Sequence, residues 1–256
     1  MGGKDTDRLL ERPAAATETI RVLVVDEDAK RLATALEQTD EQFAVETAAT
    51  AAAGLNHLEE TSFDCIVSSY QLPATNGLEL FEAVRERDSR IPFILSAGAG
   101  AEEIVERAFA AGVSDYVQGG ETAVLANRIE TEVRRHRNKH RAERMKATLE
   151  ASHDGVAIFD SEGQFQYVND AYASVYGYSP EELVGGGWEQ LYPEEEIEHY
   201  ENEIVPTLHS EGGWIGDCEC LHRDGFRFRS THSISQLEDG GHICVIHHGS
   251  VRASET

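Results

Sequence analysis

Acidic side chains that could hold a metal ion follow the first apolar run of this chain. Asp26, Glu27 and Asp28 come directly after the apolar residues 22–25. Carboxylate oxygens are ligands that Mg²⁺ accepts, and this ion also keeps waters in its shell. Acidic residues favour the start of a helix as well, so both roles stay open for the cluster. We predict Asp26 and Glu27 as a candidate Mg²⁺ site.

A second set of reactive side chains falls near the carboxyl end. Pairing His222 with Phe226 across a hairpin turn places Cys218 opposite Ser230 and close to His232. Thiols and an imidazole on one sheet face could bind a soft metal or act as a redox sensor. Buried cysteine also serves as a small apolar residue, and this alternative stays open. The predicted ligand pocket consists of Cys218, Cys220, Phe228, Ser230 and His232.

The first of these sets lies in a region of alternating strands and helices. From residue 20 to residue 133, five apolar runs, at 22–25, 43–45, 65–68, 93–95 and 116–117, alternate with amphipathic helical stretches. This pattern predicts an α/β fold with a doubly wound, parallel, five-stranded sheet. The functional site of such a sheet is expected at the carboxyl ends of its strands.

A basic segment follows at residues 134–146, where seven Arg or Lys accompany one Glu. It lies in a stretch without Gly or Pro, residues 121–153, which predicts one long linking helix. The rest of the chain is strongly acidic, with a formal net charge of -25 overall, and would repel a phosphate backbone. We expect a solvated linker or a short dimeric coiled coil here, and nucleic acid is an unlikely partner.

The second region, residues 147–250, has the texture of antiparallel strands joined by turns. Two hairpins are predicted, one across residues 160–163 and one across residues 223–225. Helical pieces are expected at 170–176, 180–183 and 194–208, and a final strand at 242–247. This region is predicted as an α+β domain.

The first region resembles a response-regulator receiver domain. The resemblance rests on residues 22–28 (VLVVDED), 64–73 (DCIVSSYQLP), Asn76-Gly77 and 111–116 (AGVSDY). Receivers use an acidic pair, a phosphoacceptor aspartate, a Ser or Thr, and a Lys at successive strand ends. At the matching positions this sequence has Asp26 and Glu27 for the acidic pair, Ser69 for the phosphoacceptor, Ala97 for the Ser or Thr, and Gly119 for the Lys. Tyr116 is a further switch position. If the register differs by one residue, Ser96 would supply the hydroxyl in place of Ala97.

The replacement of aspartate by Ser69 decides how we interpret the receiver. An aspartate attacks phosphorus and coordinates the metal, whereas a serine hydroxyl does neither at neutral pH without an adjacent base. Glycine at position 119 cannot pair with an acyl phosphate as lysine does. We therefore predict a pseudo-receiver whose acidic pair is a vestigial Mg²⁺ site.

The second region resembles a PAS sensory domain. The resemblance rests on residues 154–156 (DGV), 167–169 (YVN), 176–185 (YGYSPEELVG), 213–216 (GWIG) and 223–225 (RDG), and implies an antiparallel five-stranded sheet. The cysteine motif of flavin-binding members is absent. His199 lies in the segment where haem-binding members carry a histidine, but a solvated helix histidine is the favoured interpretation. The ligand therefore stays unidentified, and the domain could hold no cofactor. The Asp-Ile-Thr connector of the family is replaced by His248, Gly249 and Ser250.

Together these features predict a non-catalytic signal-transduction protein. Expected segments are a disordered tail at 1–19, the receiver at 20–133, the basic linker at 134–146, the PAS domain at 147–250 and a tail at 251–256. Expected partners are a histidine kinase or a receiver, and a homodimer could form through the linker helix or the PAS domain. A receiver with residual switching, and a transcription regulator acting through a partner, are the alternatives. A histidine kinase is not expected, because its phosphorylation and nucleotide motifs are missing.

The overall composition indicates where the protein works. An acidic chain with only four lysines resembles cytoplasmic proteins of extreme halophiles. Its four cysteines form no disulfide pattern, and no apolar run is long enough to span a membrane. We therefore expect a cytoplasmic protein.

Overall fold

The computed structural model describes residues 19–88, 90–98, 102–118 and 121–253. The chain divides into two compact units, Met1–Arg141 and Ala142–Thr256. Within the described residues, no helix is both long and apolar enough to cross a membrane. The predicted tail at 1–19 lies outside the described residues except for Thr19.

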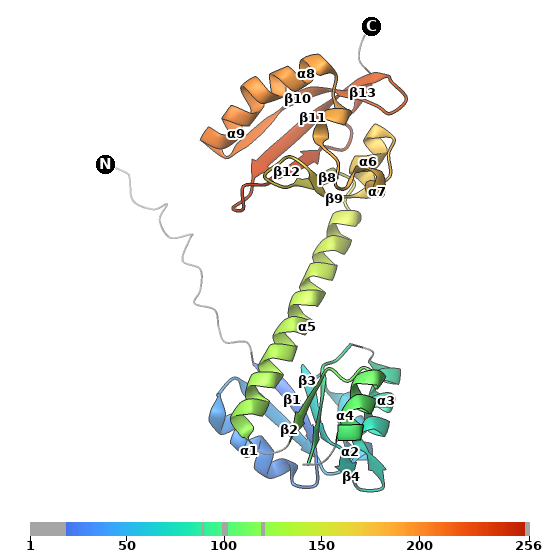
Figure 1. Ribbon diagram of the computed structural model, residues 1–256, viewed down its shortest axis with the longest axis vertical. Coiled ribbons are helices and arrows are strands. Elements are labelled where there is room, and N and C mark those ends of the chain that lie inside the picture. The colour runs from blue at the N-terminus through green and yellow to red at the C-terminus, as the bar shows by residue number, and fades with distance from the viewer. Residues whose placement is uncertain (1–18, 89, 99–101, 119–120, 254–256) are drawn as a thin grey trace, which may run out of the picture. The chain divides into compact units, whose positions relative to one another are not determined.

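The first unit is built on a parallel sheet of five strands in the order β2-β1-β3-β6-β7. Helices cover both of its faces (Figure 1), as the alternating sequence pattern predicts. The elements are β1 (Ile20–Val25), α1 (Ala29–Thr39), β2 (Phe43–Ala48), α2 (Ala51–Glu60), β3 (Cys65–Ser69), β4 (Gln71–Leu72), β5 (Thr75–Asn76), α3 (Gly77–Arg87), β6 (Phe93–Ala97), α4 (Glu102–Ala111), β7 (Asp115–Gln118) and α5 (Thr122–Glu150), of which β4 and β5 pair with each other outside the main sheet. The predicted doubly wound fold is confirmed.

Side chains alternate between the two faces of this sheet and make two apolar layers. Val22, Val67 and Ile94 pack with α1 and α5, whereas Leu23 and Leu95 point to the opposite layer, with α3 and α4. Such continuous burial on both faces is typical of a central parallel sheet. The carboxyl ends of the strands meet at one edge of the sheet, where the degenerate phosphoacceptor position, Ser69, is expected.

The predicted linking helix is confirmed as α5, a continuous helix of 29 residues. Its first half contributes Leu125, Ala126, Ile129 and Val133 to the core of the first unit. Beyond Val133 no residue of α5 is buried. The basic segment thus begins where the packed part of α5 ends.

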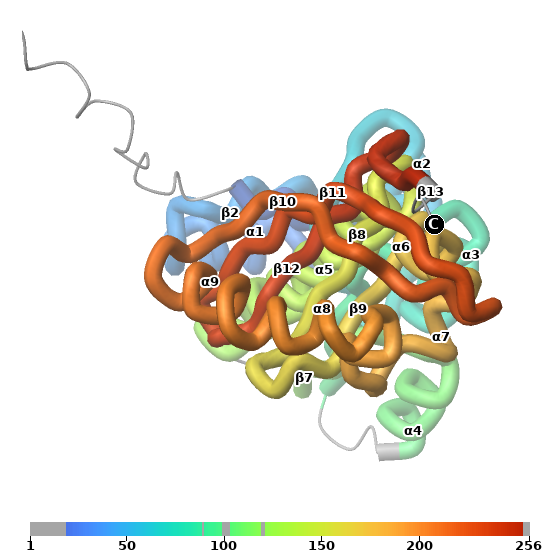
Figure 2. Tube along the Cα trace, turned by 90° about the horizontal axis from the view of Figure 1, so that it is seen from above, coloured from blue at the N-terminus to red at the C-terminus, as the bar shows by residue number. Residues whose placement is uncertain are grey.

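The second unit is an antiparallel sheet in the order β10-β11-β12-β8-β9, and β13 adds a short pairing to β11. Figure 2 shows the helices α8 and α9 running along this sheet, and α9 packs against β10 and β11. The elements are β8 (Gly155–Phe159), β9 (Phe165–Val168), α6 (Asp170–Tyr176), α7 (Pro180–Leu183), η1 (Trp188–Leu191), α8 (Glu194–His199), η2 (Tyr200–Ile204), α9 (Val205–Glu211), β10 (Gly213–Leu221), β11 (Arg227–Gln236), β12 (His242–Ile246) and β13 (Arg252–Ala253). Both predicted hairpins, β8–β9 and β10–β11, are present.

Two details differ from the sequence-based expectation. The helix expected at 194–208 contains a π-helical turn, η2, in which the Val205 N–H reaches back to the Tyr200 carbonyl. Pro206 has no N–H and cannot bond to a carbonyl four residues back, so regular helical bonding is already interrupted here. Within the predicted tail at 251–256, Arg252 and Ala253 form β13 instead.

The turn between α6 and α7 explains the conspicuous run at residues 176–185. Gly177 ends α6 with φ of 81°, and a Cβ there would lie 2.3 Å from His222 Nε2. The Glu182 carboxylate accepts the Ser179 N–H at 2.8 Å and binds Arg223 Nη1 at 3.1 Å. This run therefore specifies local structure, and it holds the β10–β11 hairpin to the helices.

Candidate functional site

The positions matched to the receiver's phosphorylation site lie at the carboxyl edge of the parallel sheet. Asp26 follows β1, Ser69 ends β3, and Ala97 ends β6. One carboxylate oxygen of Asp26 accepts the Asp28 N–H at 2.6 Å, so this side chain also shapes its own loop. Within the described residues no group of three or more acidic, histidine or cysteine side chains could hold a metal. The Mg²⁺ role of Asp26 and Glu27 thus stays a prediction.

The sheet register places a hydroxyl beside Ser69. Ser69 pairs with Ser96 of β6, and the Tyr70 N–H donates to the Ser96 carbonyl at 2.7 Å. By strand alternation, Ser69 and Ser96 point to the same face, and Ala97 points to the other. The register therefore favours Ser96, the alternative position, over Ala97.

Of the two further switch positions, the structure describes Tyr116 but not Gly119. Tyr116 on β7 is half-buried and packs against the apolar layer that contains Leu95. Gly119, the position matched to lysine, lies outside the described residues. Neither position has a demonstrated role.

The chain returns very close to Ser69 at the start of α3. A Cβ on Gly77 would lie 2.5 Å from the Ser69 carbonyl oxygen and 2.6 Å from Leu95 Cδ1. Only glycine fits this approach, and Asn76 caps α3 through its side-chain oxygen. Between Leu72 and Thr75, Ala74 adopts φ of 63°, a left-handed conformation that costs a non-glycine residue free energy.

Asp64, the carboxylate nearest to Ser69 along the β3 segment, lies at the other end of the strand. Asp64 precedes β3 at the amino edge of the sheet, where it accepts the Arg21 N–H at 2.9 Å and binds Arg137 Nη2 at 2.8 Å. It therefore cannot stand in for an aspartate at the opposite end of the strand.

The predicted pocket residues of the second unit do come together. Cys218 pairs with Ser230, and the His222 N–H donates to the Phe226 carbonyl at 2.9 Å, as the predicted register requires. All five predicted residues are buried and belong to one sheet face, namely Cys218, Cys220, Phe228, Ser230 and His232. They form part of the packed core of this unit.

His232 is the centre of a buried polar cluster. Its Nε2 lies 2.7 Å from Ser230 Oγ and 3.6 Å from Cys220 Sγ, and its Nδ1 lies 3.2 Å from Tyr192 Oη. A neutral imidazole donates from one nitrogen and accepts at the other, so one hydroxyl donates to the ring and the other accepts from it. Burial lowers the pKa of His232 to about 4, which keeps the ring neutral at pH 7.

The thiols around His232 stay protonated, and this limits their chemistry. Burial raises the pKa of Cys220 to about 11 and that of Cys244 to about 12, and it also raises the pKa of Cys218. A thiol that stays protonated is a weak nucleophile and a poor metal ligand. Cys220 and Cys244 also face different ring nitrogens of His232, at 3.6 and 3.8 Å, so the three groups do not converge on one point.

Sequence analysis missed three members of this cluster. Cys244 lies on β12, and Tyr176 and Tyr192 come from helical segments; the Tyr176 hydroxyl donates to Cys220 Sγ at 3.6 Å. Alternation along β12 could have placed Cys244 on the buried face. No sequence signal indicates which tyrosines reach the sheet.

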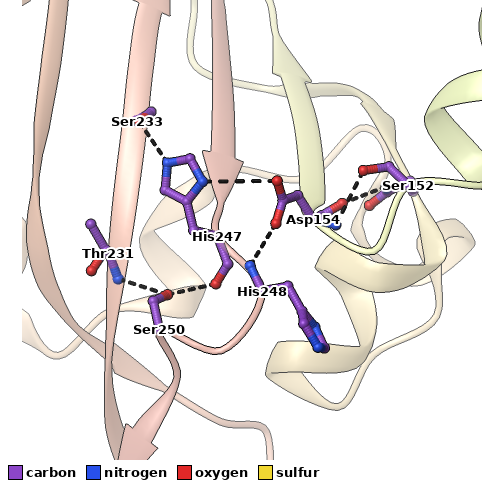
Figure 3. A network of polar contacts seen from close by, with 8 residues as sticks. Ser152, Asp154, Thr231, Ser233, His247, His248 and Ser250 are labelled. Carbon is purple, nitrogen blue, oxygen red and sulfur yellow. Dashed lines mark hydrogen bonds and ion pairs between the residues drawn. The ribbon is translucent and has the colours of Figure 1, made fainter.

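A second polar network lies on the exposed face of the same sheet (Figure 3). Ser233 Oγ lies 2.9 Å from His247 Nε2, and His247 Nδ1 lies 3.8 Å from an Asp154 carboxylate oxygen. The other oxygen of Asp154 accepts the His248 N–H at 2.6 Å. The chain leaving β12 is thereby fastened to the residue that precedes β8.

The serine of this Ser-His-Asp arrangement lies within the sheet. Ser233 pairs with Ile215 on one side and Val245 on the other, so its backbone is committed to the sheet. A serine nucleophile needs free N–H groups nearby to stabilise the oxyanion. The arrangement is consistent with a structural fastening between two ends of the domain.

Ser250 extends this fastening at the carboxyl end. Its hydroxyl donates to the His247 carbonyl at 2.7 Å and accepts the Thr231 N–H at 3.1 Å. These bonds hold the connector residues against β11 (Figure 3). The replaced connector thus keeps ordered contacts with the sheet.

Comparison with known proteins identifies two families along the chain. The family model of the response regulator receiver domain matches residues 22–125, and that of the PAS fold matches residues 149–246. The bacterioopsin transcriptional activator of Halobacterium salinarum is 28% identical over 246 residues, 88% of this chain and 36% of its own length. A sensor histidine kinase of Ectopseudomonas mendocina is 21% identical over 89% of this chain and 27% of its own length. The chain therefore spans about a third of these relatives.

Each unit is also similar to solved structures. A CheY-like receiver domain protein of Methanospirillum hungatei has 25% identity and a TM-score of 0.44, covering 48% of this chain and 99% of that protein. A PAS domain of Colwellia psychrerythraea has 20% identity and a TM-score of 0.40, covering 43% and 97%.

Proposed function

This chain joins a response regulator receiver domain to a PAS domain, and on that premise we propose that it transmits signals by protein contact, without phosphoryl transfer to its receiver. Receiver and PAS domains are regulatory modules of signal transduction. The observation that carries the proposal is Ser69 at the end of β3, where the phosphoacceptor would lie. Enzymatic activity is not part of the proposed function.

The surroundings of Ser69 support this proposal. In the described part of the chain, no hydrogen bond joins the Ser69 hydroxyl to a histidine or a carboxylate that could act as a base. Asp64 is held by Arg137 at the opposite edge. The receiver surface is therefore proposed to bind a partner, such as a kinase or another receiver, in one fixed state.

The PAS domain is proposed to relay contact changes. Its core is filled by its own side chains around His232, and the polar atoms there bond to one another. The Asp154 fastening links the start of β8 to the segment after β12, so a shift of the sheet would reach both ends of the domain. Dimerisation through this domain or α5 is one way such a shift could arise.

Transcriptional control is a second candidate output. It is favoured by the similarity to the bacterioopsin transcriptional activator, which extends over both domains. This chain would then act on transcription through a partner, since its basic segment is flanked by acidic regions. A cytoplasmic location is proposed because the four cysteines are buried free thiols.

Intact-mass analysis after incubation with acetyl phosphate and Mg²⁺ tests the proposal. The wild-type protein is expected to gain no phosphoryl group, and beryllofluoride is expected to leave the amide signals at the sheet edge unchanged. The Ser69→Asp variant is the matched control, because it restores the missing carboxylate at the same position. A phosphoryl group on the wild-type receiver, or a saturable beryllofluoride shift, would establish residual switching instead, with Ser96 as the hydroxyl opposite Ser69.

A further inference from the structure

The amino edge of the receiver sheet carries a basic pocket that the proposed function does not use. Its volume is about 320 Å³, and it is lined by Arg134, Arg137 and Arg141 of α5 together with Gln42 and Glu130. Ile20, at the start of β1, also contributes, and its N–H donates to the Gln42 carbonyl. The pocket thus lies at the opposite end of the strands from Ser69.

The three arginines share one side of α5 because they are three and four residues apart. Arg137 is held in place, since its Nη2 binds Asp64 at 2.8 Å and the Thr19 carbonyl at 3.2 Å. Arg134 and Arg141 are exposed, and no ion pair joins either to another described residue. Two guanidinium groups therefore lie at the pocket with their donors available.

The pocket lining also holds one carboxylate, Glu130, whose hydrogen bond to a neutral amide leaves its charge in place beside the three guanidinium groups. Glu130 accepts a hydrogen bond from Gln42 Nε2 at 3.1 Å, and Gln42 also binds Asp40 at 2.9 Å. Asp64 is occupied by Arg137. Because the chain as a whole carries a formal charge of -25, three arginines around one pocket make a local exception.

We propose that this pocket binds a small ligand carrying two or more phosphate groups, of the nucleotide or pyrophosphate class. Guanidinium groups bind phosphate oxygens in bidentate fashion. Arg134 and Arg141 are seven residues apart, about 10 Å along the helix, so their long side chains can approach a pyrophosphate from its two ends. The volume is that of a small-ligand site.

Calorimetric titration of the full chain with inorganic pyrophosphate, in concentrated KCl, tests this proposal. The wild-type protein is expected to bind one pyrophosphate saturably. The double variant Arg134→Ala, Arg141→Ala should lose affinity at least ~10-fold, because each substitution removes a charged hydrogen-bonding group. Both residues are exposed, and circular dichroism would verify that the variant remains folded.

The double variant Arg135→Ala, Arg144→Ala is the matched control, since it removes the same charge from the same helix outside the pocket. It should bind pyrophosphate as the wild type does. An equal loss of pyrophosphate affinity in both double variants would indicate general charge attraction and would overturn the proposal. The proposal would also be overturned if binding were not saturable, if citrate bound as tightly as pyrophosphate, or if the protein preferred duplex DNA.

Discussion

The carboxyl edge of the receiver sheet and the core of the PAS domain both have serines on strands, but the hydroxyl groups of these serines differ in their hydrogen-bond partners. Ser69 lies at a half-buried strand end that water can reach. Ser230 is buried within its sheet and bonds to His232 at 2.7 Å. At the edge, a polar side chain can be exchanged with little effect on folding because water replaces the lost partner. In the core, each polar atom depends on another protein atom.

The two regions also differ in whether their reactive residue types can react. At the edge where receivers carry out phosphoryl transfer, this chain has Ser69 at the end of β3, with Ser96 beside it in the sheet register. The core of the PAS domain gathers thiols, hydroxyls and an imidazole, yet burial keeps the thiols protonated and the imidazole neutral. The reactive residue types are therefore concentrated where their reactivity is lowest.

The largest expected effect is on the buried cluster. His232→Ala should lower the free energy of unfolding of the PAS domain by about 3–5 kcal/mol, because it leaves a cavity and an unpaired Tyr192 hydroxyl, while Ser230 keeps only its 3.3 Å contact with Cys220 Sγ. Both tryptophans, Trp188 and Trp214, belong to this unit, so their fluorescence in denaturant follows its unfolding. His247→Ala, at an exposed histidine of the same sheet, should cost less than about 1 kcal/mol. Equal costs would remove the proposed difference between buried and open networks.

The pH dependence of stability gives a second, smaller effect. In the folded state the pKa of His232 is about 4, below its ordinary value of 6.5, so the unfolded chain binds this proton more readily. Its contribution is fully present above pH 6.5 and is lost as the pH falls toward 4. Between pH 7 and pH 5.5 the loss should be about 1 kcal/mol. The His232→Gln variant should lack this part of the slope, and an unchanged slope would contradict burial of a neutral imidazole.

The receiver edge should tolerate, and even gain from, a local change. Ala74→Gly relieves a left-handed conformation and should raise the stability of the receiver by about 0.5–1 kcal/mol. Hydrogen exchange of the β3 amides reports this value for the receiver alone. Ala83→Gly, inside α3, is the control and should lower stability by about 1 kcal/mol. Destabilisation by Ala74→Gly would show that this edge is more tightly constrained than we infer.

The smallest effect is expected at the exposed fastening in Figure 3. Its ion pair joins His247 and Asp154, whose side chains are 46% and 42% exposed. A double-mutant cycle with Asp154→Asn and His247→Gln should give a coupling free energy below about 0.5 kcal/mol. A coupling as large as that within the buried cluster would show that connectivity, rather than burial, sets the difference between the networks.

Much of the fold could be predicted from the sequence because its patterns are periodic. Alternating strands and helices predicted the receiver sheet, and the turn at residues 223–225 fixed the register that places Cys218 opposite Ser230. The choice between Ser96 and Ala97 could not be settled, since a one-residue shift in a parallel strand leaves the apolar pattern of residues 93–95 compatible with either.

The parts that sequence analysis missed depend on contacts between distant segments. Tyr192 reaches His232 across 40 residues, and Arg137 reaches Asp64 across 73. Nothing local to these residues signals such pairings. The π-helical turn was also missed, since Pro206 lies in the segment predicted as one helix and a proline alone does not indicate which form an interruption takes.

That turn has a consequence for the permitted length of the chain. Tyr200 stacks on Trp188 with ring centroids 4.2 Å apart, and Leu208, eight residues later, is fully buried. In a regular helix, residues seven apart share a face better than residues eight apart, and the wider turn compensates for the extra residue. A chain one residue shorter between Tyr200 and Leu208, and without Pro206, would make both contacts with an unbroken α-helix. Here, the change of helix type accommodates one additional residue while both contacts are kept.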